Sequence, residues 1–370
     1  MKPTLHVVAL PHTATTAVFS SCAYTQKIRK FVPMMRAQGY RVILYGSELT
    51  DVEADEHVTI TTEEERAARF GPGFDTVLTP LKWESHEPYW ATANAAAAHA
   101  IAERCDRRDL LCLIAGWAQQ PISLALPFLT AAEWGVGYEG VLPNSHRAFE
   151  SAAWKHYVYG KQGETNGRWY DAVIPNFFDP ADFPRLGRGD GGYLLYLGRL
   201  VQRKGVEVAW QIAQRCGRKL IVAGPGAIAS GSGYVRSPEV TLRGPRSQLE
   251  YVGEVGIEER AELLEHAAAL LAPTLYVEPF GGVAVEAMLA GTPAVTSDFG
   301  AFTETVEEGV TGYRFRTLAE GAEAVERAVT LNRHLIRRRA LARFSMDAVG
   351  PMFDRWFGEL DGLWEGGWDA

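Results

Sequence analysis

The sequence predicts an α/β protein made of two domains, each a parallel sheet covered on both faces by helices. Short apolar runs without polar alternation recur along the whole chain, which is typical of strands buried on both faces of a parallel sheet. Segments with helical periodicity separate these runs, as in successive β-α-β units. The 370 residues are enough for two domains with separate cores.

The first set of alternating elements occupies the N-terminal part of the chain. A strand is expected over residues 5–10, followed by a helix over 23–40 with an apolar face, formed by Ile28, Phe31, Met34 and Met35. Further strands are expected at residues 41–46, 110–116, 128–134 and 171–178. The alternation stops at residues 177–192, whose Pro, Gly and Asp content favours a linker between domains.

A second set of elements follows this linker. Strands are expected at 193–200, 219–226 and 250–255, helices at 205–217 and 257–271, and strand-and-loop units at 272–280 and 292–298. We therefore expect a first domain over residues 1–182, a second over 190–345, and a C-terminal helix within 346–370 that packs back on the first domain. Ligands of doubly wound sheets bind beyond the carboxyl ends of the strands, so a cleft between two facing domains is expected.

Composition narrows the class of protein. A hydrophobic content of 47% with 22% charged residues is that of a soluble globular chain. The first apolar run is too short for a signal peptide and no run is long enough to span a membrane, so we expect a cytoplasmic protein without a membrane span. The four cysteines lack metal-ligand spacing and are expected to be reduced thiols. The net charge of −8 disfavours nonspecific binding to nucleic acid or anionic membrane.

Two cations follow the first strand of the second domain. Arg199 and Lys204 lie in the segment "GRLVQRKG", at the carboxyl end of the strand expected over 193–200. Arginine can bind phosphate oxygens with two donors and lysine adds a point charge, so the pair suits an anionic ligand. Taken alone, the pair could equally cap a loop.

The stretch "LYVEPFGGVAVEAML" gives these cations a context. Gly281 and Gly282 precede a helix that ends at Gly291, and a helix N-terminus offers unpaired N–H groups and positive potential to a phosphate. We expect a Cβ at Gly282 to occupy the space of a phosphate or a sugar of the ligand. Glu278 before the helix and Glu286 within it can accept hydrogen bonds from hydroxyl groups. Cations and amides for a diphosphate, with carboxylates for hydroxyls, indicate a nucleotide-sugar.

Three segments carry a resemblance to a known family. "YLGRLVQRKG", "VEPFGGVAVEAMLAGTPAVTSDFGAFTETVEEGVTGYRF" and "VIPNFFDPADF" resemble family 4 of the retaining glycosyltransferases, which have the GT-B fold of two Rossmann-like domains. The likeness covers roughly residues 173–316. It implies that Arg199 and Lys204 hold the donor diphosphate, that Glu278 binds the donor sugar, and that Glu286 binds the ribose. It also implies donor contacts from the backbone at Phe280, Gly281, Gly282 and Val283, with the base near Val255.

The first domain departs from this family pattern. Where members have a glycine pair after the first strand, this chain has small and hydroxyl residues. Thr15, Thr16 or Ser21 could replace glycine amides at the phosphate, and an ordinary capped helix start is an equally open interpretation. Where members carry a histidine, Glu133 stands at the expected carboxyl end of a strand, either as a catalytic or sugar contact or in a structural ion pair. His86 lies among aromatic residues that favour a packed helix start over an acceptor contact.

The functional expectation is a metal-independent retaining glycosyltransferase that uses an NDP-sugar, UDP-linked, as co-substrate and needs no cofactor. Retention in this fold is ascribed to attack from the face that the diphosphate leaves, with a phosphate oxygen taking the acceptor proton. The acceptor stays open among a glycan, a small molecule and a modified DNA base. A sugar-nucleotide 2-epimerase of the same fold and a binding protein without catalysis are the alternative hypotheses.

Overall fold

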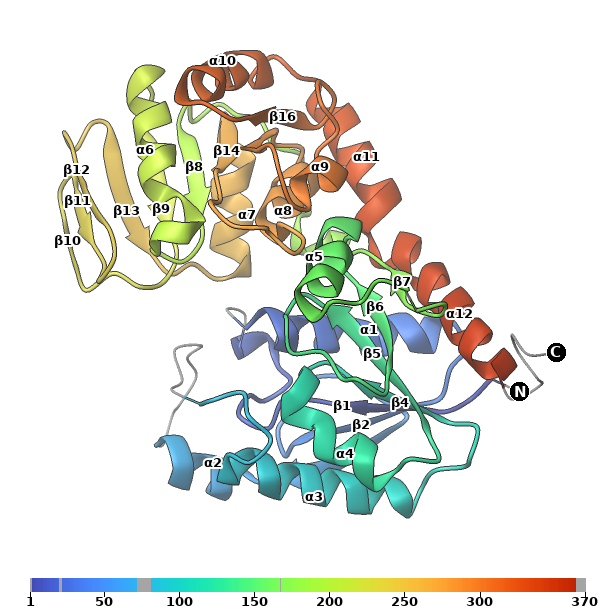
Figure 1. Ribbon diagram of the computed structural model, residues 1–370. Helices are drawn as coiled ribbons and strands as arrows, with labels where there is room; N and C mark the ends of the chain where they lie inside the picture. Colours follow the sequence, from blue (N-terminus) through green and yellow to red (C-terminus); the bar gives the residue numbers. More distant parts are fainter. Residues whose placement is uncertain (1, 20–21, 72–80, 167, 364–370) are drawn as a thin grey trace. The chain divides into compact units, whose positions relative to one another are not determined.

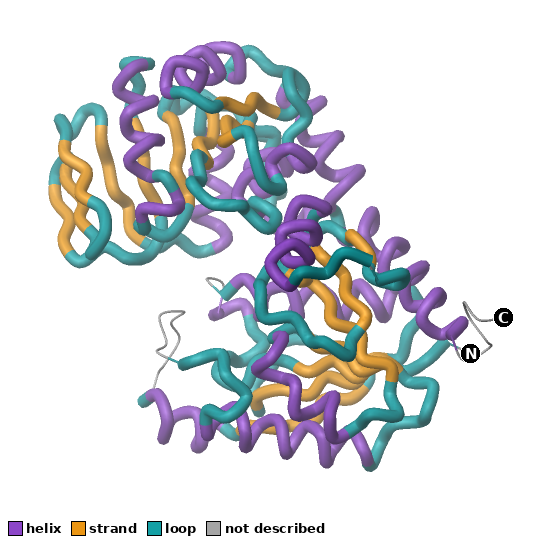
Figure 2. The backbone as a smooth tube through the Cα atoms, viewed as in Figure 1, coloured by secondary structure: helices purple, strands orange, loops and turns teal. Residues whose placement is uncertain are grey.

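The computed structural model describes residues 2–19, 22–71, 81–166 and 168–363, and divides them between two compact units. Unit 1 comprises residues 1–150, 158–177 and 346–370, and unit 2 comprises residues 151–157 and 178–345. Sequence reasoning placed the division between residues 182 and 190. In the structure the main division falls between Phe177 and Phe178, and the last helix belongs to unit 1. Each unit has strands at its centre and helices around them (Figure 2).

Unit 1 is built on a seven-stranded parallel sheet with the order β3-β2-β1-β4-β5-β6-β7. Its strands are β1 Leu5–Val8, β2 Val42–Ser47, β3 Glu56–Thr61, β4 Leu110–Leu113, β5 Thr130–Val136, β6 His146–Phe149 and β7 Ala172–Val173. Its helices are α1 Ala23–Ala37, α2 Glu63–Phe70, α3 Pro88–Ala102, α4 Gln120–Ala125 and α12 Met346–Gly362, while α5 Ala152–Gln162 is shared with unit 2.

Both faces of this sheet are buried, as the uninterrupted apolar strands predicted. Leu5 and Val7 of β1 belong to one core cluster with α1 and α12, while Val8 belongs to a second cluster with α3 and α4. Phe31 of α1 stacks on Trp134 and packs edge-on against Phe353 of α12, with centroid distances of 3.9 and 5.2 Å. Figure 1 shows α12 running beside α1, so helices from the two ends of the chain share one core.

Unit 2 is built on a six-stranded parallel sheet with the order β13-β9-β8-β14-β15-β16. These strands are β8 Leu194–Leu197, β9 Leu220–Ala223, β13 Leu249–Gly253, β14 Ala269–Ala272, β15 Ala294–Ser297 and β16 Gly312–Phe315. The helices are α6 Val206–Arg215, α7 Ile257–His266, α8 Gly282–Leu289, α9 Phe302–Thr305, α10 Leu318–Ala328 and α11 Arg333–Phe344. The predicted α/β class with two doubly wound parallel sheets is confirmed.

In unit 2, one local prediction was wrong and one small sheet was not predicted. The helix expected over 257–271 ends at His266, because the apolar run that follows it is a buried strand, β14. The connection from β9 to β13 contains an unpredicted antiparallel sheet of three short strands, β10 Ala229–Gly231, β11 Tyr234–Arg236 and β12 Thr241–Arg243. Over the described residues, no helix has the length and apolar character needed to cross a membrane.

Candidate functional site

The topology of unit 2 brings the two predicted motifs together. In its strand order, β8 and β14 are neighbours whose following connections leave in opposite directions, which creates the crevice where doubly wound sheets bind ligands. Arg199 and Lys204 follow β8, and the segment from Glu278 to Gly282 follows β14. The cations and the glutamate–glycine stretch therefore meet at the carboxyl ends of adjacent strands.

The turn that carries the cations is held by a buried tyrosine and a glycine. The Tyr196 hydroxyl donates to the carbonyl oxygen of Arg199 at 3.1 Å and lies 3.5 Å from that of Lys204, so it ties the two ends of the turn. Burial raises the pKa of Tyr196, which keeps this donor protonated. Gly205 has φ +73°, and a Cβ there would stand 1.8 Å from the Pro273 carbonyl oxygen. Only glycine allows this close approach of the turn to the loop after β14.

The charges at this turn are only partly compensated by the protein. The Lys204 ammonium donates to both carboxylate oxygens of Glu278, at 2.9 and 3.2 Å, and Glu278 is buried. The Lys204 ammonium also lies 5.0 Å from the ring centroid of Tyr276, and the guanidinium of Arg203 lies 5.1 Å from the same ring. The Arg199 side chain is exposed and has no ion-pair or hydrogen-bond partner in the described part of the chain. Positive charge is therefore left for an anion.

The glycine pair divides into two roles. Gly281 is the N-cap of α8 with φ +78°, and a Cβ there would stand 2.3 Å from the ring of Phe302. Gly281 is thus required by the turn itself. Gly282 begins the helix, and its Cβ would meet only the Phe178 ring, at an ordinary 3.6 Å. An added methyl group at Gly282 thus fits against the protein, and the expectation that it would occupy the space of the donor stays a prediction.

The backbone, not the side chains, is what this segment offers to a ligand. Phe280 is buried, with its ring packed on Phe178 and Phe344. The first N–H groups of α8, including those of Gly282 and Val283, have no acceptor inside the helix. A helix N-terminus with free N–H groups, beside Arg199 and Lys204, is suited to bind phosphate.

The second glutamate has one paired and one unpaired oxygen. Oε1 of Glu286 accepts a hydrogen bond of 2.7 Å from Nη1 of Arg260, on α7. Oε2 is buried and has no hydrogen-bond partner. An unpaired buried carboxylate oxygen is costly, so it indicates a donor that is supplied from outside the chain. Hydroxyl groups of a sugar fit this requirement.

The predicted base-contact residue lies at the neighbouring strand end. Val255 follows β13, whose last residue, Gly253, has φ +91°. Val255 and Val283 are both half-buried and pack against the core cluster that contains α8. The structure thus places Val255, Val283 and Glu286 around the same helix of unit 2.

Glu133 in unit 1 lies in a different environment from the one predicted. Sequence reasoning placed it at a carboxyl end, but β5 continues to Val136 and the Glu133 side chain is 0% exposed. Its carboxylate accepts hydrogen bonds from the Tyr138 hydroxyl (2.8 Å), the Leu142 amide (2.9 Å) and the Ser145 hydroxyl (3.1 Å). Burial raises its pKa to about 7. These contacts are those of a structural carboxyl group that fastens the loop after β5.

The other unit 1 candidates that the structure describes have separate surroundings. Thr15 is buried and pairs with Thr50 in an isolated bridge, and the Thr16 carbonyl accepts from the Gln26 side chain at 3.0 Å. His86 is exposed, with Nε2 3.0 Å from an oxygen of Glu84. Ser21 lies outside the described residues.

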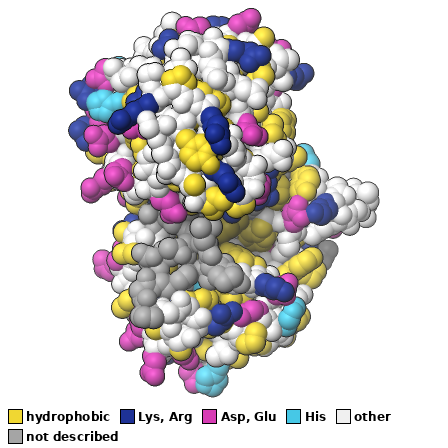
Figure 3. Space-filling model, turned by 90° about the vertical axis from the view of Figure 1, so that its left-hand side faces the viewer, with side chains coloured by type: hydrophobic (Ala, Val, Ile, Leu, Met, Phe, Trp, Pro, Cys, Tyr) yellow, Lys and Arg dark blue, Asp and Glu magenta, His cyan; other side chains and the backbone are white. Residues whose placement is uncertain are grey.

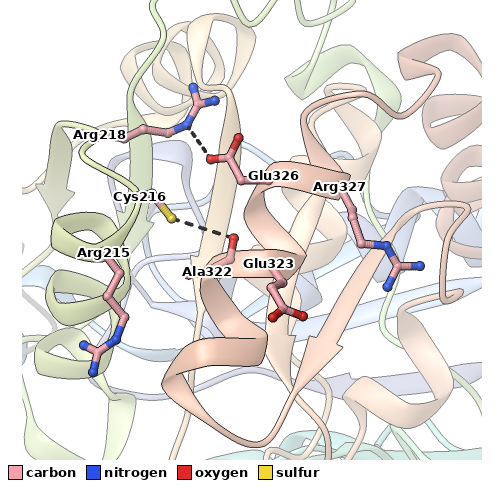
Figure 4. A pocket seen from close by; sticks show the side chains of 7 residues that line it. All are labelled: Arg215, Cys216, Arg218, Ala322, Glu323, Glu326 and Arg327. Atoms are coloured by element: carbon pink, nitrogen blue, oxygen red, sulfur yellow. Dashed lines mark hydrogen bonds and ion pairs between the residues drawn. The ribbon is translucent and has the colours of Figure 1, made fainter.

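A groove lies at the amino ends of the unit 2 strands, whereas the candidate site lies at their carboxyl ends. The groove has a volume of about 690 Å³ and lies between the C-terminal end of α6 and the helix α10. Figure 4 shows the residues that line it, which are Arg215, Cys216, Arg218, Ala322, Glu323, Glu326 and Arg327. Arg218 precedes β9, so this groove is at the amino ends of the strands. Arg218 and Glu326 form a partly exposed ion pair in this groove, so their charges compensate each other. None of the described residues that line the groove has a buried side-chain N or O atom without a hydrogen-bond partner, whereas Oε2 of Glu286 is such an atom.

Charge elsewhere on the surface is mixed. On the face drawn in Figure 3, Lys and Arg side chains alternate with Asp and Glu, and neither sign covers a continuous area. Among the residues that the structure describes, no group of three His, Cys, Asp or Glu side chains is arranged to hold a metal ion.

Arg260 is the site residue that sequence reasoning missed, although the sequence contained a signal. In "IEERAELLEH", the apolar positions Ile257, Ala261 and Leu264 define the buried face of the helix, and Arg260 falls on that same face. A cation on the buried face of an amphipathic helix needs a partner, which here is Glu286.

A known family matches the part of the chain that forms most of unit 2. Residues 179–342 match the family described as glycosyl transferases group 1. The chain is 37% identical over 180 residues to the glycogen synthase of Mycobacterium tuberculosis, which covers 46% of this chain and 42% of that protein. It is 36% identical over 143 residues to the D-inositol 3-phosphate glycosyltransferase of Nocardia farcinica, covering 36% of this chain and 28% of that protein. The chain thus spans less than half the length of these curated relatives.

Solved structures extend the likeness in fold to both units. Sucrose-phosphate synthase from Thermosynechococcus elongatus superposes with a TM-score of 0.67 at 17% identity, covering 98% of this chain and 100% of the other. AviGT4, a glycosyltransferase of avilamycin A biosynthesis, gives 0.63 at 19%, covering 97% and 98%. Anabaena Alr3699/HepE, solved with UDP-glucose, gives 0.62 at 14%, covering 96% and 99%. The chain therefore has the GT-B fold, and its residues 179–342 match the family described as glycosyl transferases group 1.

Proposed function

We propose that this protein is a retaining glycosyltransferase that transfers a sugar from a UDP-sugar to a hydroxyl group of an acceptor, without a metal ion. The observation that carries the proposal is the meeting, at the carboxyl ends of β8 and β14, of Arg199 and Lys204, the α8 N-terminus and two glutamates. These groups match the three parts of a nucleotide-sugar: the diphosphate, the sugar and the ribose. Anabaena Alr3699/HepE, which has a similar fold, was solved in complex with UDP-glucose, and this supports the choice of UDP.

In the proposed reaction, the bond between the anomeric carbon and the β-phosphate oxygen breaks while the acceptor oxygen attacks from the same face. The acceptor proton passes to an oxygen of the departing phosphate, so no protein base is required. Negative charge grows on the diphosphate during this step. Arg199, Lys204 and the N–H groups of α8 are placed to stabilise that charge, which is the role a metal ion fills in other enzymes.

Glu278 would bind sugar hydroxyls, and its contact with Lys204 joins the sugar and diphosphate parts of the site. The Lys204 ammonium has three donor hydrogens, so it can keep Glu278 as a partner and still donate to a phosphate oxygen. Glu286 would accept from the ribose at its unpaired Oε2. The acceptor class, a glycan, a small molecule or a modified DNA base, remains to be identified by experiment.

The test is a screen of UDP-, GDP- and ADP-sugars for nucleotide release, first alone and then with pooled acceptors. We expect release that depends on a UDP-sugar and an acceptor, gives a product with the anomeric configuration of the donor, and continues in excess EDTA. A loss of activity in EDTA that manganese restores would refute the metal-free part. Conversion of UDP-GlcNAc to its 2-epimer without an acceptor would instead support the epimerase.

A further inference from the structure

We infer that Arg260 is a positioning residue that makes the site selective for nucleotides with intact ribose hydroxyls. This inference rests on the proposed function and extends it, since it concerns how Glu286 is held before the donor arrives. It starts from one contact, the 2.7 Å hydrogen bond from Nη1 of Arg260 to Oε1 of Glu286.

The contact lies in a sheltered position. The side chains of Arg260 and Glu286 are 22% and 13% exposed, and they join α7 to α8 across the same core cluster. Charge-assisted hydrogen bonds shielded from water are stronger than exposed ones, so this pair restricts Glu286 to one orientation.

The pairing leaves the two carboxylate oxygens of Glu286 unlike each other. Oε1 is occupied by Arg260, whereas Oε2 is buried without a partner. Because a carboxylate can only accept hydrogen bonds, the missing partner of Oε2 must be a donor. A ribose hydroxyl is such a donor, and a deoxyribose that lacks it would leave Oε2 unpaired in the complex as well. Sites built to hydrogen-bond a hydroxyl reject analogues without it for this reason.

Without Arg260, Glu286 would lose its fixed orientation and could turn its carboxylate toward water. The bound nucleotide would then gain little from its ribose hydroxyls, because Glu286 would have to be ordered again on binding. Selectivity for ribose over dideoxyribose should therefore fall along with affinity. A purely structural arginine would affect stability but not this selectivity.

The pair Arg218–Glu326 provides a matched control. It also joins two elements of unit 2, with Nε of Arg218 3.3 Å from Oε1 of Glu326, but it lies at the amino ends of the strands. Its side chains are 28% and 58% exposed, so its removal should change neither nucleotide affinity nor selectivity.

The experiment measures the affinities of UDP and 2′,3′-dideoxy-UDP by calorimetry for the wild-type protein and for Arg260→Met, Arg260→Lys and Arg218→Met. For the wild type we expect UDP to bind about tenfold more tightly than the dideoxy form, the effect of losing a hydrogen bond to a charged group. Arg260→Met should weaken UDP binding about tenfold and reduce the selectivity to less than about threefold. Arg260→Lys should restore part of both, and Arg218→Met should match the wild type.

Each outcome separates the inference from the proposed function. If the wild type binds UDP with selectivity for ribose, and Arg260→Met keeps that selectivity, the inference is wrong while the proposed function stands. An equal loss of affinity for both nucleotides, together with a lower melting temperature, would make Arg260 merely structural. If the wild type does not bind UDP, the proposed use of a UDP-sugar itself fails.

Discussion

Replacing each glycine of the pair at the start of α8 with alanine should give opposite results. At Gly281, an alanine must adopt φ +78° and place its Cβ 2.3 Å from the Phe302 ring. The left-handed backbone costs about 1–2 kcal/mol, and relief of the overlap costs about 1–3 kcal/mol more. At about 2–4 °C per kcal/mol for a unit of this size, Gly281→Ala should lower the melting temperature of unit 2 by roughly 4–20 °C.

Gly282→Ala should leave the melting temperature unchanged or raise it slightly. The new Cβ meets only the Phe178 ring at 3.6 Å, and alanine favours the helix over glycine by up to about 1 kcal/mol. The N–H group that the site uses is retained, so UDP affinity should stay within about threefold of the wild type. Thermal melting and calorimetry with UDP on the two variants measure both quantities.

Two results would refute this reasoning. A melting temperature of Gly281→Ala within a degree of the wild type would show that the turn does not need glycine. A stable Gly282→Ala that no longer binds UDP would show that the space beside Gly282 belongs to the donor, as the sequence alone had suggested.

Three further predictions test other parts of the structure. Lys204→Ala should reduce transfer at saturating donor about 10²-fold while the circular dichroism spectrum is retained, because a charge that offsets the departing diphosphate is lost; an unchanged rate would contradict its role. The Glu239 carboxylate accepts from the Gln202 amide at 2.9 Å and so fastens the cationic turn to the loop between β11 and β12. Glu239→Ala should therefore raise the donor KM a few-fold, and Glu239→Gln should not. Equal KM values for the two variants would show that this hydrogen bond does not hold the cationic turn in place. Glu133 has its pKa raised to about 7 by burial, so the folded protein holds a proton there that the unfolded chain releases above about pH 4.5. Its contribution to stability is lost as the pH rises from 4.5 through 7, and thermal melts at pH 5 and pH 8 should differ less for Glu133→Gln than for the wild type; equal differences would contradict the shift.

Much of the fold was predictable because its signals are local. A strand buried on both faces reads as a short apolar run, and such runs mark most strands of both sheets. The boundary at His266 was missed because an apolar run after an amphipathic helix has no period that distinguishes a further turn of helix from a strand. The sheet of β10, β11 and β12 was missed because each strand has only three residues, too few to show alternation.

The candidate site also has parts that the sequence could predict and parts that it could not. Arg199 and Lys204 lie within one turn, and Glu278, Gly282 and Glu286 within one short stretch, so sequence distance predicts that the members of each group lie together. The meeting of the two groups depends on the pairing of β8 with β14. The link between Arg260 and Glu286 depends on how α7 and α8 pack, which no local pattern states. The burial of Glu133 depends on where β5 ends and on hydrogen bonds from the loop beyond it, so its environment could be known only from the structure.

The sharing of one core by α1 and α12 has a consequence for how the protein is made. A ribosome releases α1 early and α12 only after all of residues 178–345 have emerged. Until then the apolar face of α1, with Phe31, lacks the partner that Phe353 provides. The core of unit 1 therefore cannot be complete until the last helix has been made. A nascent chain that stalls or is cut before Met346 would carry an unfinished core in unit 1, a form that chaperones would have to shield from aggregation.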